Sequence, residues 1–384
     1  MNNIMDYLTW RGDISFTASP FNEIDNLILT QIVYLDFTDI VPNSGAENIA
    51  LQEAARRFGE KYAGASKENL TDLEKNCAVL LKAMAGSVRF QNCMLSGFWK
   101  EISVEQESQF AALRIGLEDG STYVSFCGTD SSVAGWKENF NMSFMTETPG
   151  QRKAVVYLTE AAQDTAVLRV GGHSKGGNLA VYAAMHLAPE LQGHLTAIYN
   201  NDGPGFTEKM ISESGYLAVL ERIHTYVPKS SVVGLLLEHE ETYHIIHSSN
   251  AGLLQHDAFS WEVEGTTFIY SDSLERNSIV LDKALKLWLN RLNDDSRRKF
   301  VDSLFSILEK SQIENTEVLG HLKWAQLMEL IKVAEGLTAE EKAVLIKTMK
   351  LLLETYIQIW ADDRLNIKAG NVLQLREKSD IEPV

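Results

Sequence analysis

One serine of this chain lies between two glycines at the spacing that a catalytic nucleophile requires. Segment 172–176 reads Gly-His-Ser-Lys-Gly, with Ser174 at its centre, and matches the G-x-S-x-G pattern of a nucleophile elbow. In that motif the serine sits on a strained turn, so its hydroxyl rises above the edge of a sheet. Gly172 and Gly176 are needed because a Cβ at either position would collide with the crossing strand or helix. Ser174 is therefore the predicted nucleophile, and an acyl-enzyme is the intermediate that it would form.

The sequence around Ser174 contains the two elements that such a turn must join. An apolar run at 166–171 predicts a strand, and apolar residues at helical spacing through 175–187 predict a helix. Two other kinds of glycine-rich motif do not match this segment. A phosphate-binding loop needs Gly-Lys-Ser or Gly-Lys-Thr, which is absent, and the glycine spacing differs from that of a dinucleotide-binding fingerprint.

A serine hydroxyl is a poor nucleophile at neutral pH, so a general base must lie within hydrogen-bond distance of it. In hydrolases built on this elbow, the acid and then the histidine follow the serine in the chain. His256 lies on a loop after a late strand, from which an imidazole can reach the nucleophile, and it is the predicted base. His173 adjoins Ser174, and its ring is expected to point elsewhere.

The base in turn needs a carboxylate that orients its ring. Asp202 directly follows the predicted strand 195–200 in a turn-rich segment at the same sheet edge as the elbow, and it is the predicted acid. A residue of this type in a turn also serves simply to shape the loop. Glu238 and Glu240, which come after the next strand, stay open as alternatives.

An acyl transfer also needs hydrogen-bond donors for the oxyanion that develops on the substrate. The first predicted donor is the backbone N–H of Lys175, the residue after the nucleophile. The second is Thr129, which follows a predicted strand in a glycine-containing segment and whose hydroxyl adds a further hydrogen bond. Together these donors form the predicted oxyanion hole.

The pattern of the chain changes from helical to alternating and supports an α/β fold. Segments 110–117 and 122–126 predict a hairpin, after which helices and strands alternate. The alternating elements are predicted at 152–163, 166–171, 175–187, 195–200, 207–222 and 223–227. Such alternation predicts a mostly parallel central sheet with helices on both faces. Thr129, Ser174 and Asp202 then meet at the carboxyl ends of the strands, where ligands bind in such sheets.

The remaining segments frame this sheet. Helices are predicted at 22–37, 47–62 and 71–85, and strands at 242–247 and 261–270. The apolar run 232–237 fits either the core or the lining of an apolar pocket. Beyond residue 270 the periodicity is helical throughout. We therefore predict a domain at 1–270 and a helical C-terminal module at 271–384.

Composition excludes several classes of function. Thirty-five basic residues against 52 acidic ones give a formal net charge of −17, which disfavours a nucleic-acid partner. Three cysteines without paired spacing suggest neither a disulfide framework nor a zinc site. Segment 1–12 lacks the pattern of a secretory signal, and no apolar run approaches the roughly 18 residues of a transmembrane helix. A cytoplasmic location is expected.

A metal-dependent reaction is the weakest interpretation of the sequence. His239 and His244 are five residues apart, whereas a helical pair of zinc ligands needs a spacing of four. We predict no metal ion and no cofactor.

Several segments resemble a known group of enzymes. Segment 126–132 with Trp136 resembles the oxyanion segment of class 3 lipases, and 172–177 is similar to their elbow. Segments 10–13, 201–206 and 255–261 resemble a bacterial family of lipase-like α/β-hydrolases. The resemblance covers roughly residues 5 to 270. It departs from class 3 lipases at Cys127, where they usually carry arginine, and at 227–232, which lacks a clear equivalent of their aspartate.

The elbow, the downstream histidine and this resemblance imply an α/β-hydrolase fold and a serine hydrolase that cleaves a carboxylic ester or a thioester. The expected substrate is a small-molecule or lipid ester. The alternative is a catalytically silent hydrolase-fold protein with a binding or regulatory role. In either case the helical tail is a candidate surface for a protein partner or for self-association.

Overall fold

The computed structural model describes residues 2–63, 70–103, 105, 108–129, 137–138, 141–142, 145, 147–310 and 336–379. Contacts between Cα atoms divide the chain into two compact units. The first contains Met1–Leu274, and the second begins at Glu275.

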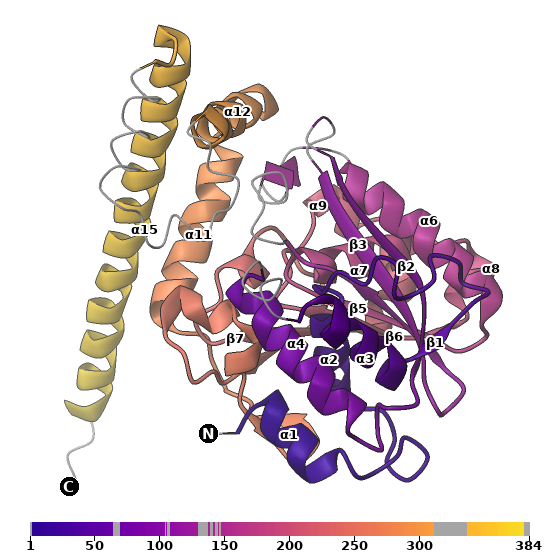
Figure 1. The fold of residues 1–384 in the computed structure, drawn as a ribbon. Coiled ribbons are helices and arrows are strands. Elements are labelled where there is room, and N and C mark those ends of the chain that lie inside the picture. The colour runs from indigo at the N-terminus through magenta and orange to yellow at the C-terminus, as the bar shows by residue number, and fades with distance from the viewer. Residues whose placement is uncertain are drawn as a thin grey trace, which may run out of the picture. The chain divides into compact units, whose positions relative to one another are not determined.

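The first unit is built on an eight-stranded sheet whose strands lie in the order of the sequence (Figure 1). The strands from β1 to β4 pair antiparallel, and those from β4 to β8 pair parallel. Their bounds are β1 Ile49–Ala50, β2 Met94–Ser103, β3 Ser108–Gly116, β4 Thr122–Phe126, β5 Leu168–His173, β6 Leu195–Asn201, β7 Ile223–Pro228 and β8 Tyr243–Ile246. The predicted hairpin of β3 and β4 and the parallel strands that follow it are confirmed, whereas β2 was not predicted.

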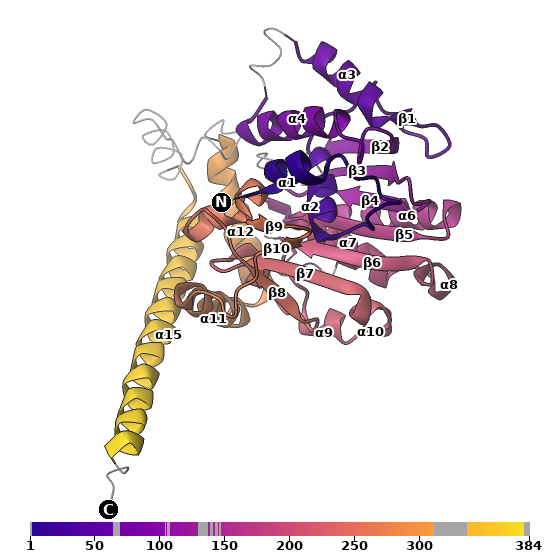
Figure 2. The ribbon, with the colours of Figure 1, turned by 90° about the horizontal axis from the view of Figure 1, so that it is seen from below.

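Helices cover both faces of the sheet. The crossover helices α6 (Pro149–Asp164), α7 (Lys175–Met185) and α10 (Ser214–Val219) share one apolar core with the strands. Helices α1 (Ile4–Arg11), α2 (Glu23–Ile32) and α4 (Asp72–Ala85) form a second core on the other face (Figure 2). Helix α3 (Leu51–Lys61) packs on α4. Parallel strands in sequential order need crossovers of one hand, which place their helices on one face. The predicted α/β-hydrolase fold is confirmed.

Two predicted elements of this unit are interrupted. The helix predicted at 207–222 is divided into α9 (Glu208–Ile211), α10 and a 3₁₀ turn, Leu220–Arg222. At Gly215 a Cβ would lie 2.1 Å from the carbonyl oxygen of Met185, so this glycine allows α10 to approach α7. The strand predicted at 261–270 is instead the short hairpin of β9 (Val263–Glu264) and β10 (Thr267–Phe268), which turns at Gly265 with φ +63°. The short helix α8 is Pro189–Gln192.

A buried ion pair joins α2 to the segment that follows α4. The guanidinium of Arg89 donates to both carboxylate oxygens of Asp25, and both side chains are fully buried. The other N–H groups of Arg89 donate to main-chain carbonyl groups, among them those of Ile14 and Pro20. This pair thus closes the N-terminal segment onto the second core.

Removing one partner of this ion pair is expected to destabilise the fold strongly. In Arg89→Met, the carboxylate of Asp25 stays buried without its counterion, which should lower the free energy of unfolding by about 3–5 kcal/mol. Urea unfolding followed by circular dichroism measures the change. Arg56→Met is the matched control, because Arg56 pairs with Glu53 at the surface, where solvent screens the pair, and its loss should change the free energy of unfolding far less. Equal losses in the two variants would contradict a special role for the buried pair.

The second unit contains three described helices, α11 (Arg276–Asn290), α12 (Asp294–Lys310) and α15 (Ala339–Ser379). Helix α15 packs against the other two. The indole N–H of Trp288 in α11 donates to the carbonyl oxygen of Thr348 in α15 at 3.0 Å. The prediction of a helical C-terminal module is confirmed. In the parts of the chain that the structure describes, no helix is both long and apolar enough to cross a membrane.

Candidate active site

Ser174 occupies a strained turn between β5 and α7. Its backbone has φ 57° and ψ −132°, a combination that a side-chain-bearing residue rarely adopts. Its N–H donates to the carbonyl oxygen of Asn201 at 2.9 Å, which ties the turn to the end of β6. A Cβ on Gly172 would lie 2.1 Å from the carbonyl carbon of Gly176, and one on Gly176 would lie 2.2 Å from the carbonyl oxygen of Phe126. The two glycines therefore allow the crossing that the elbow requires.

Asp202 and His256 form a hydrogen-bonded pair, although 54 residues separate them in the chain. The Nδ1 atom of His256 lies 2.6 Å from Oδ2 of Asp202. Asp202 is fully buried and directly follows β6, whereas the side chain of His256 is 30% exposed. The second carboxylate oxygen accepts hydrogen bonds from the hydroxyl of Ser231 and from the N–H of Gly234. The carboxylate is thus fixed from three sides, and it orients the imidazole ring.

The alternative acids lie in other surroundings. Glu240 is exposed, and Glu238 forms a backbone bridge with Phe206. The next carboxylate, Glu241, accepts hydrogen bonds from Tyr216, Thr225 and His239, which lower its pKa to about 2 despite burial. The hydrogen bond of His256 goes to Asp202 rather than to any of these glutamates.

A cavity of about 400 Å³ opens beside Ser174 and His256. Its lining combines residues from α2, α4 and the loop segments after β4, β7 and β8. The lining residues are Gln31, Tyr34, Asp72, Leu73, Asn76, Thr129, His173, Ser174, Val233, Asn250, Leu254, His256, Asp257 and Ala258. Ser174 and His256 share this cavity, but no hydrogen bond joins their side chains.

The apolar run 232–237 serves both of the purposes that the sequence left open. Val233 lines the cavity, whereas Leu235 is buried in the core. Leu254 also lines the cavity, and it is 70% exposed. An apolar side chain therefore stands at the open side of the site.

His173 does not point away from the site, so that expectation was wrong. Its ring lies 4.7 Å from the ring of His256, between centroids, and its Nε2 atom lies 2.8 Å from the carbonyl oxygen of His256. Its Nδ1 atom lies 3.2 Å from the hydroxyl of Tyr34. Burial, and then the nearby imidazole, hold the pKa of His173 well below its usual range, so the ring is neutral. A neutral ring that donates from Nε2 fixes the backbone of His256 and accepts from Tyr34 at Nδ1.

The predicted oxyanion donors lie at the same end of the sheet as Ser174. Thr129 follows β4 and lines the cavity, and its hydroxyl oxygen is buried without a hydrogen-bond partner among the described residues. Lys175 begins α7, where the first backbone N–H groups have no partner within the helix. Segment 130–132 and Trp136, which the family resemblance singled out, lie outside the described residues.

The side chain of Lys175 has a separate function that sequence reasoning missed. Its ammonium group is fully buried and lies 2.8 Å from a carboxylate oxygen of Glu138, which is also fully buried. It donates as well to the main-chain and side-chain carbonyl oxygens of Gln109. Glu138 accepts a further hydrogen bond from the N–H of Gly150. This network anchors the start of α7 to β3. A lysine within the elbow segment pointed to a facing acid, but the local sequence does not show that the acid is Glu138.

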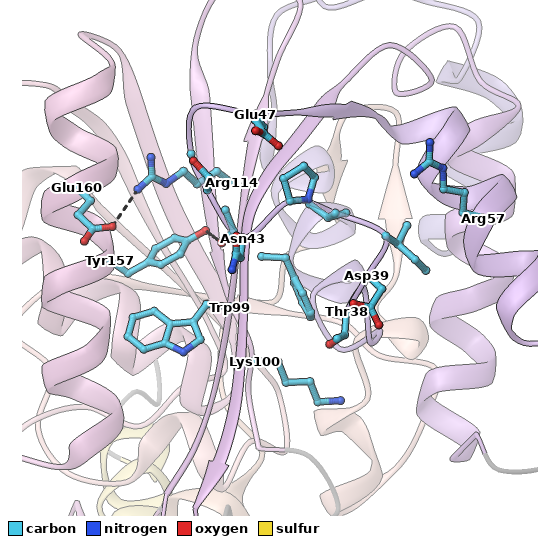
Figure 3. Close-up of a pocket in the computed structure, with 17 residues that line it drawn as sticks. Thr38, Asp39, Asn43, Glu47, Arg57, Trp99, Lys100, Arg114, Tyr157 and Glu160 are labelled. Atoms are coloured by element: carbon cyan, nitrogen blue, oxygen red, sulfur yellow. Dashed lines mark hydrogen bonds and ion pairs between the residues drawn. The ribbon is translucent and has the colours of Figure 1, made fainter.

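A larger cavity of the first unit, of about 930 Å³, lies among loop 38–47, β2 and α6 (Figure 3). Arg114 lines it, and its guanidinium pairs with Asp164 at 2.7 Å and lies over the ring of Tyr157. Neither Ser174 nor His256 contributes to this cavity. Its lining contains no histidine and no cysteine, and its one serine, Ser44, has no histidine beside it in the lining. Size alone therefore does not identify the site of chemistry.

His239 and His244, the histidines considered as metal ligands, contact other side chains. His239 lies 2.9 Å from Glu241, and the ring of His244 stacks on Tyr226. Within the described ranges, no group of three or more histidine, cysteine, aspartate or glutamate side chains is arranged to hold a metal ion.

Comparison with known proteins gives three findings. The model of the Mbeg1-like family matches residues 84–306, which is more than half of the chain. A solved structure described as "Crystal structure of M37 lipase" is 13% identical in sequence, with a TM-score of 0.33, and the similarity covers 54% of this chain and 68% of that one. No curated protein matches the sequence.

Proposed function

Because the chain belongs to the Mbeg1-like family, a lipase-like family of α/β-hydrolases, we propose that it is a serine hydrolase that cleaves a carboxylic ester through an acyl-enzyme on Ser174. One observation carries the proposal. A buried carboxylate, Asp202, orients the imidazole of His256 at the mouth of the cavity that also contains the strained Ser174. Nucleophile, base and orienting acid are the three groups that acyl transfer to a serine requires.

In this mechanism His256 accepts and donates protons at its Nε2 atom, since Nδ1 is hydrogen-bonded to Asp202. Nε2 takes the hydroxyl proton as Ser174 attacks the ester carbonyl, and returns it to the oxygen of the departing alcohol. A water molecule then attacks the acyl-enzyme by the same route and releases the carboxylic acid. The distance from Ser174 to His256 must shorten when substrate binds, as is common for catalytic hydrogen bonds in free enzymes.

The apolar part of the cavity supports an ester with a hydrocarbon acyl group. Leu73, Val233 and Leu254 line it together with the ring of Tyr34. The three aliphatic side chains carry no hydrogen-bonding group, and the hydroxyl of Tyr34 already lies 3.2 Å from Nδ1 of His173, so this part of the wall suits a hydrocarbon chain. The proposed substrates are therefore small-molecule or lipid esters, and the chemistry extends equally to a thioester. The three free, buried cysteines favour a cytoplasmic location.

The direct test combines covalent labelling with turnover. A fluorophosphonate probe should label the full-length protein at Ser174, with loss of fluoride, and peptide mass spectrometry locates the label. Nitrophenyl esters of increasing acyl length should be hydrolysed in the same preparation. Labelling that is unchanged in Ser174→Ala would reject the proposal.

The Thr129 hydroxyl gives a further prediction. Because this buried oxygen has no partner among the described residues, we expect it to donate to the oxyanion. Thr129→Val should lower kcat about 10²-fold with little change in KM, measured with a nitrophenyl ester. Thr196→Val is the control, because the hydroxyl of Thr196 donates to the carbonyl of Leu168 on β5, outside the cavity. An equal loss in both variants would argue against an oxyanion role.

The alternative function is a catalytically silent protein that binds a ligand in the same cavity. The missing hydrogen bond between Ser174 and His256 is the observation in its favour. It predicts that esters bind without turnover, so hydrolysis that is lost in His256→Ala would reject it.

A further inference from the structure

An apolar stripe runs along one side of α15. Five large hydrophobic side chains within 15 residues of this helix are each between 40% and 68% exposed. They are Ile346, Met349, Leu353, Ile357 and Trp360. Successive members are three, four, four and three residues apart, a mean spacing of 3.5 residues. That period keeps all five on one side of a helix and is the spacing by which two helices interlock side by side.

The stripe faces away from the helices that α15 contacts within its own unit. Thr348 and Thr355 lie on the opposite side of α15 and are almost fully buried. Trp288 of α11 donates to the carbonyl of Thr348, and Arg291 donates to the hydroxyl of Thr355 at 2.9 Å. Among the described residues of this unit, α15 packs on its neighbours through one side and leaves an apolar surface on the other.

The spacing of the stripe is symmetric about Leu353. Met349 and Ile357 each lie four residues from it, and Ile346 and Trp360 each lie seven residues from it. A twofold interface between antiparallel helices requires this property, because every residue then meets its mirror position on the other copy. A different protein would impose no such symmetry on the surface that it binds.

We propose that the stripe is a self-association surface on which a second copy of this chain packs its own α15 antiparallel, with the twofold axis at Leu353. Ile346 then faces the partner's Trp360, and Met349 faces the partner's Ile357. The proposal is independent of catalysis at Ser174.

The charges beside the stripe fit the same arrangement. Lys350 and Glu354 lie on one side of it and form an exposed ion pair within the chain at 3.7 Å. In the antiparallel dimer the same sides of the two stripes meet. Lys350 therefore comes beside the partner's Glu354, and the contact occurs twice around the axis.

Sedimentation of the full-length protein tests the association. The wild type should sediment at twice the mass of one chain, and Leu353→Glu, which places two carboxylates on the axis, should sediment as a monomer. Lys350→Glu should weaken the dimer by opposing like charges, and the double variant Lys350→Glu, Glu354→Lys should restore it. Leu217→Glu, at an exposed leucine of α10, is the control that leaves the mass unchanged. A wild type that stays monomeric at the highest concentration reached overturns the proposal, even if the stripe binds another protein.

Cysteine cross-linking tests the orientation. Ile346→Cys and Trp360→Cys should form an intermolecular disulfide when the two variants are mixed, and little when each is oxidised alone. Helices that pack parallel would give the reverse result, which would overturn the antiparallel arrangement. A disulfide needs Cα atoms within roughly 7 Å, so the product reports the register directly. The native cysteines are buried and should not interfere. Circular dichroism confirms that each variant is folded.

Discussion

Replacing Ser174 with alanine is expected to lower kcat for a nitrophenyl ester by about 10⁴-fold or more. In the proposed mechanism the substitution removes the only atom that would form the covalent bond to the acyl group, so the remaining groups could at most polarise the ester. Binding should change little, because the cavity walls and the oxyanion donors stay in place. The Kd of a non-hydrolysed analogue, or the KM of the residual turnover, measures this binding.

The fold should tolerate this substitution. The backbone hydrogen bond from Ser174 to Asn201 is independent of the side chain. Alanine keeps a Cβ at the same strained backbone conformation, and the thermal midpoint should therefore stay close to that of the wild type. Ser212→Ala, at an exposed serine after α9, is the control for preparation and assay. Turnover within tenfold of the wild type in Ser174→Ala would show that another group is the nucleophile.

Asp202→Asn is expected to lower kcat by about 10⁴-fold through the tautomer of His256. Ser231 and Gly234 both donate to one carboxylate oxygen, so the carbonyl oxygen of asparagine should take that position. The amide NH₂ group then faces Nδ1 of His256, which must accept instead of donate. The ring proton moves to Nε2, and the imidazole can no longer take the proton of Ser174.

Single substitutions of the two other candidate acids, Glu238 and Glu240, separate this effect from a general change in charge. Glu238→Gln and Glu240→Gln should each change kcat less than about threefold, because neither carboxylate is bonded to His256. Fluorophosphonate labelling of Asp202→Asn should slow in proportion to kcat. A fully active Asp202→Asn together with an inactive Glu238→Gln would assign the orienting acid to Glu238, in the segment between β7 and β8.

Much of the fold was predictable because the elbow around Ser174 and the alternation of strands with helices are both visible in short stretches of sequence. The strand, the turn and the helix around Ser174 follow from an apolar run, two obligatory glycines and helical periodicity within about 20 residues. The parallel strands followed from their regular alternation with helices. Glycine positions were informative because the backbone crossing at Gly172 and Gly176 leaves no room for a side chain.

The elements that were missed depend on contacts that the local sequence does not encode. Strand β2 carries a register shift between Ser96 and Trp99, and Gly97 within it has φ +61°. An irregularity of this kind interrupts the alternation that predicts a strand. The ion pair of Lys175 with Glu138 and the contact between the rings of His173 and His256 join distant segments, and no periodicity in the sequence predicts them.

Segment 250–258 contributes both the imidazole of His256 and much of the cavity wall, including Asn250, Leu254 and Ala258. Selection for a new acyl group would act mainly on this segment, because the strands of the sheet also form the core and tolerate little change. Each such change would also alter the distance between the imidazole of His256 and Ser174. In this protein, substrate preference and catalytic rate should therefore evolve together, and relatives that differ in the first are expected to differ in the second.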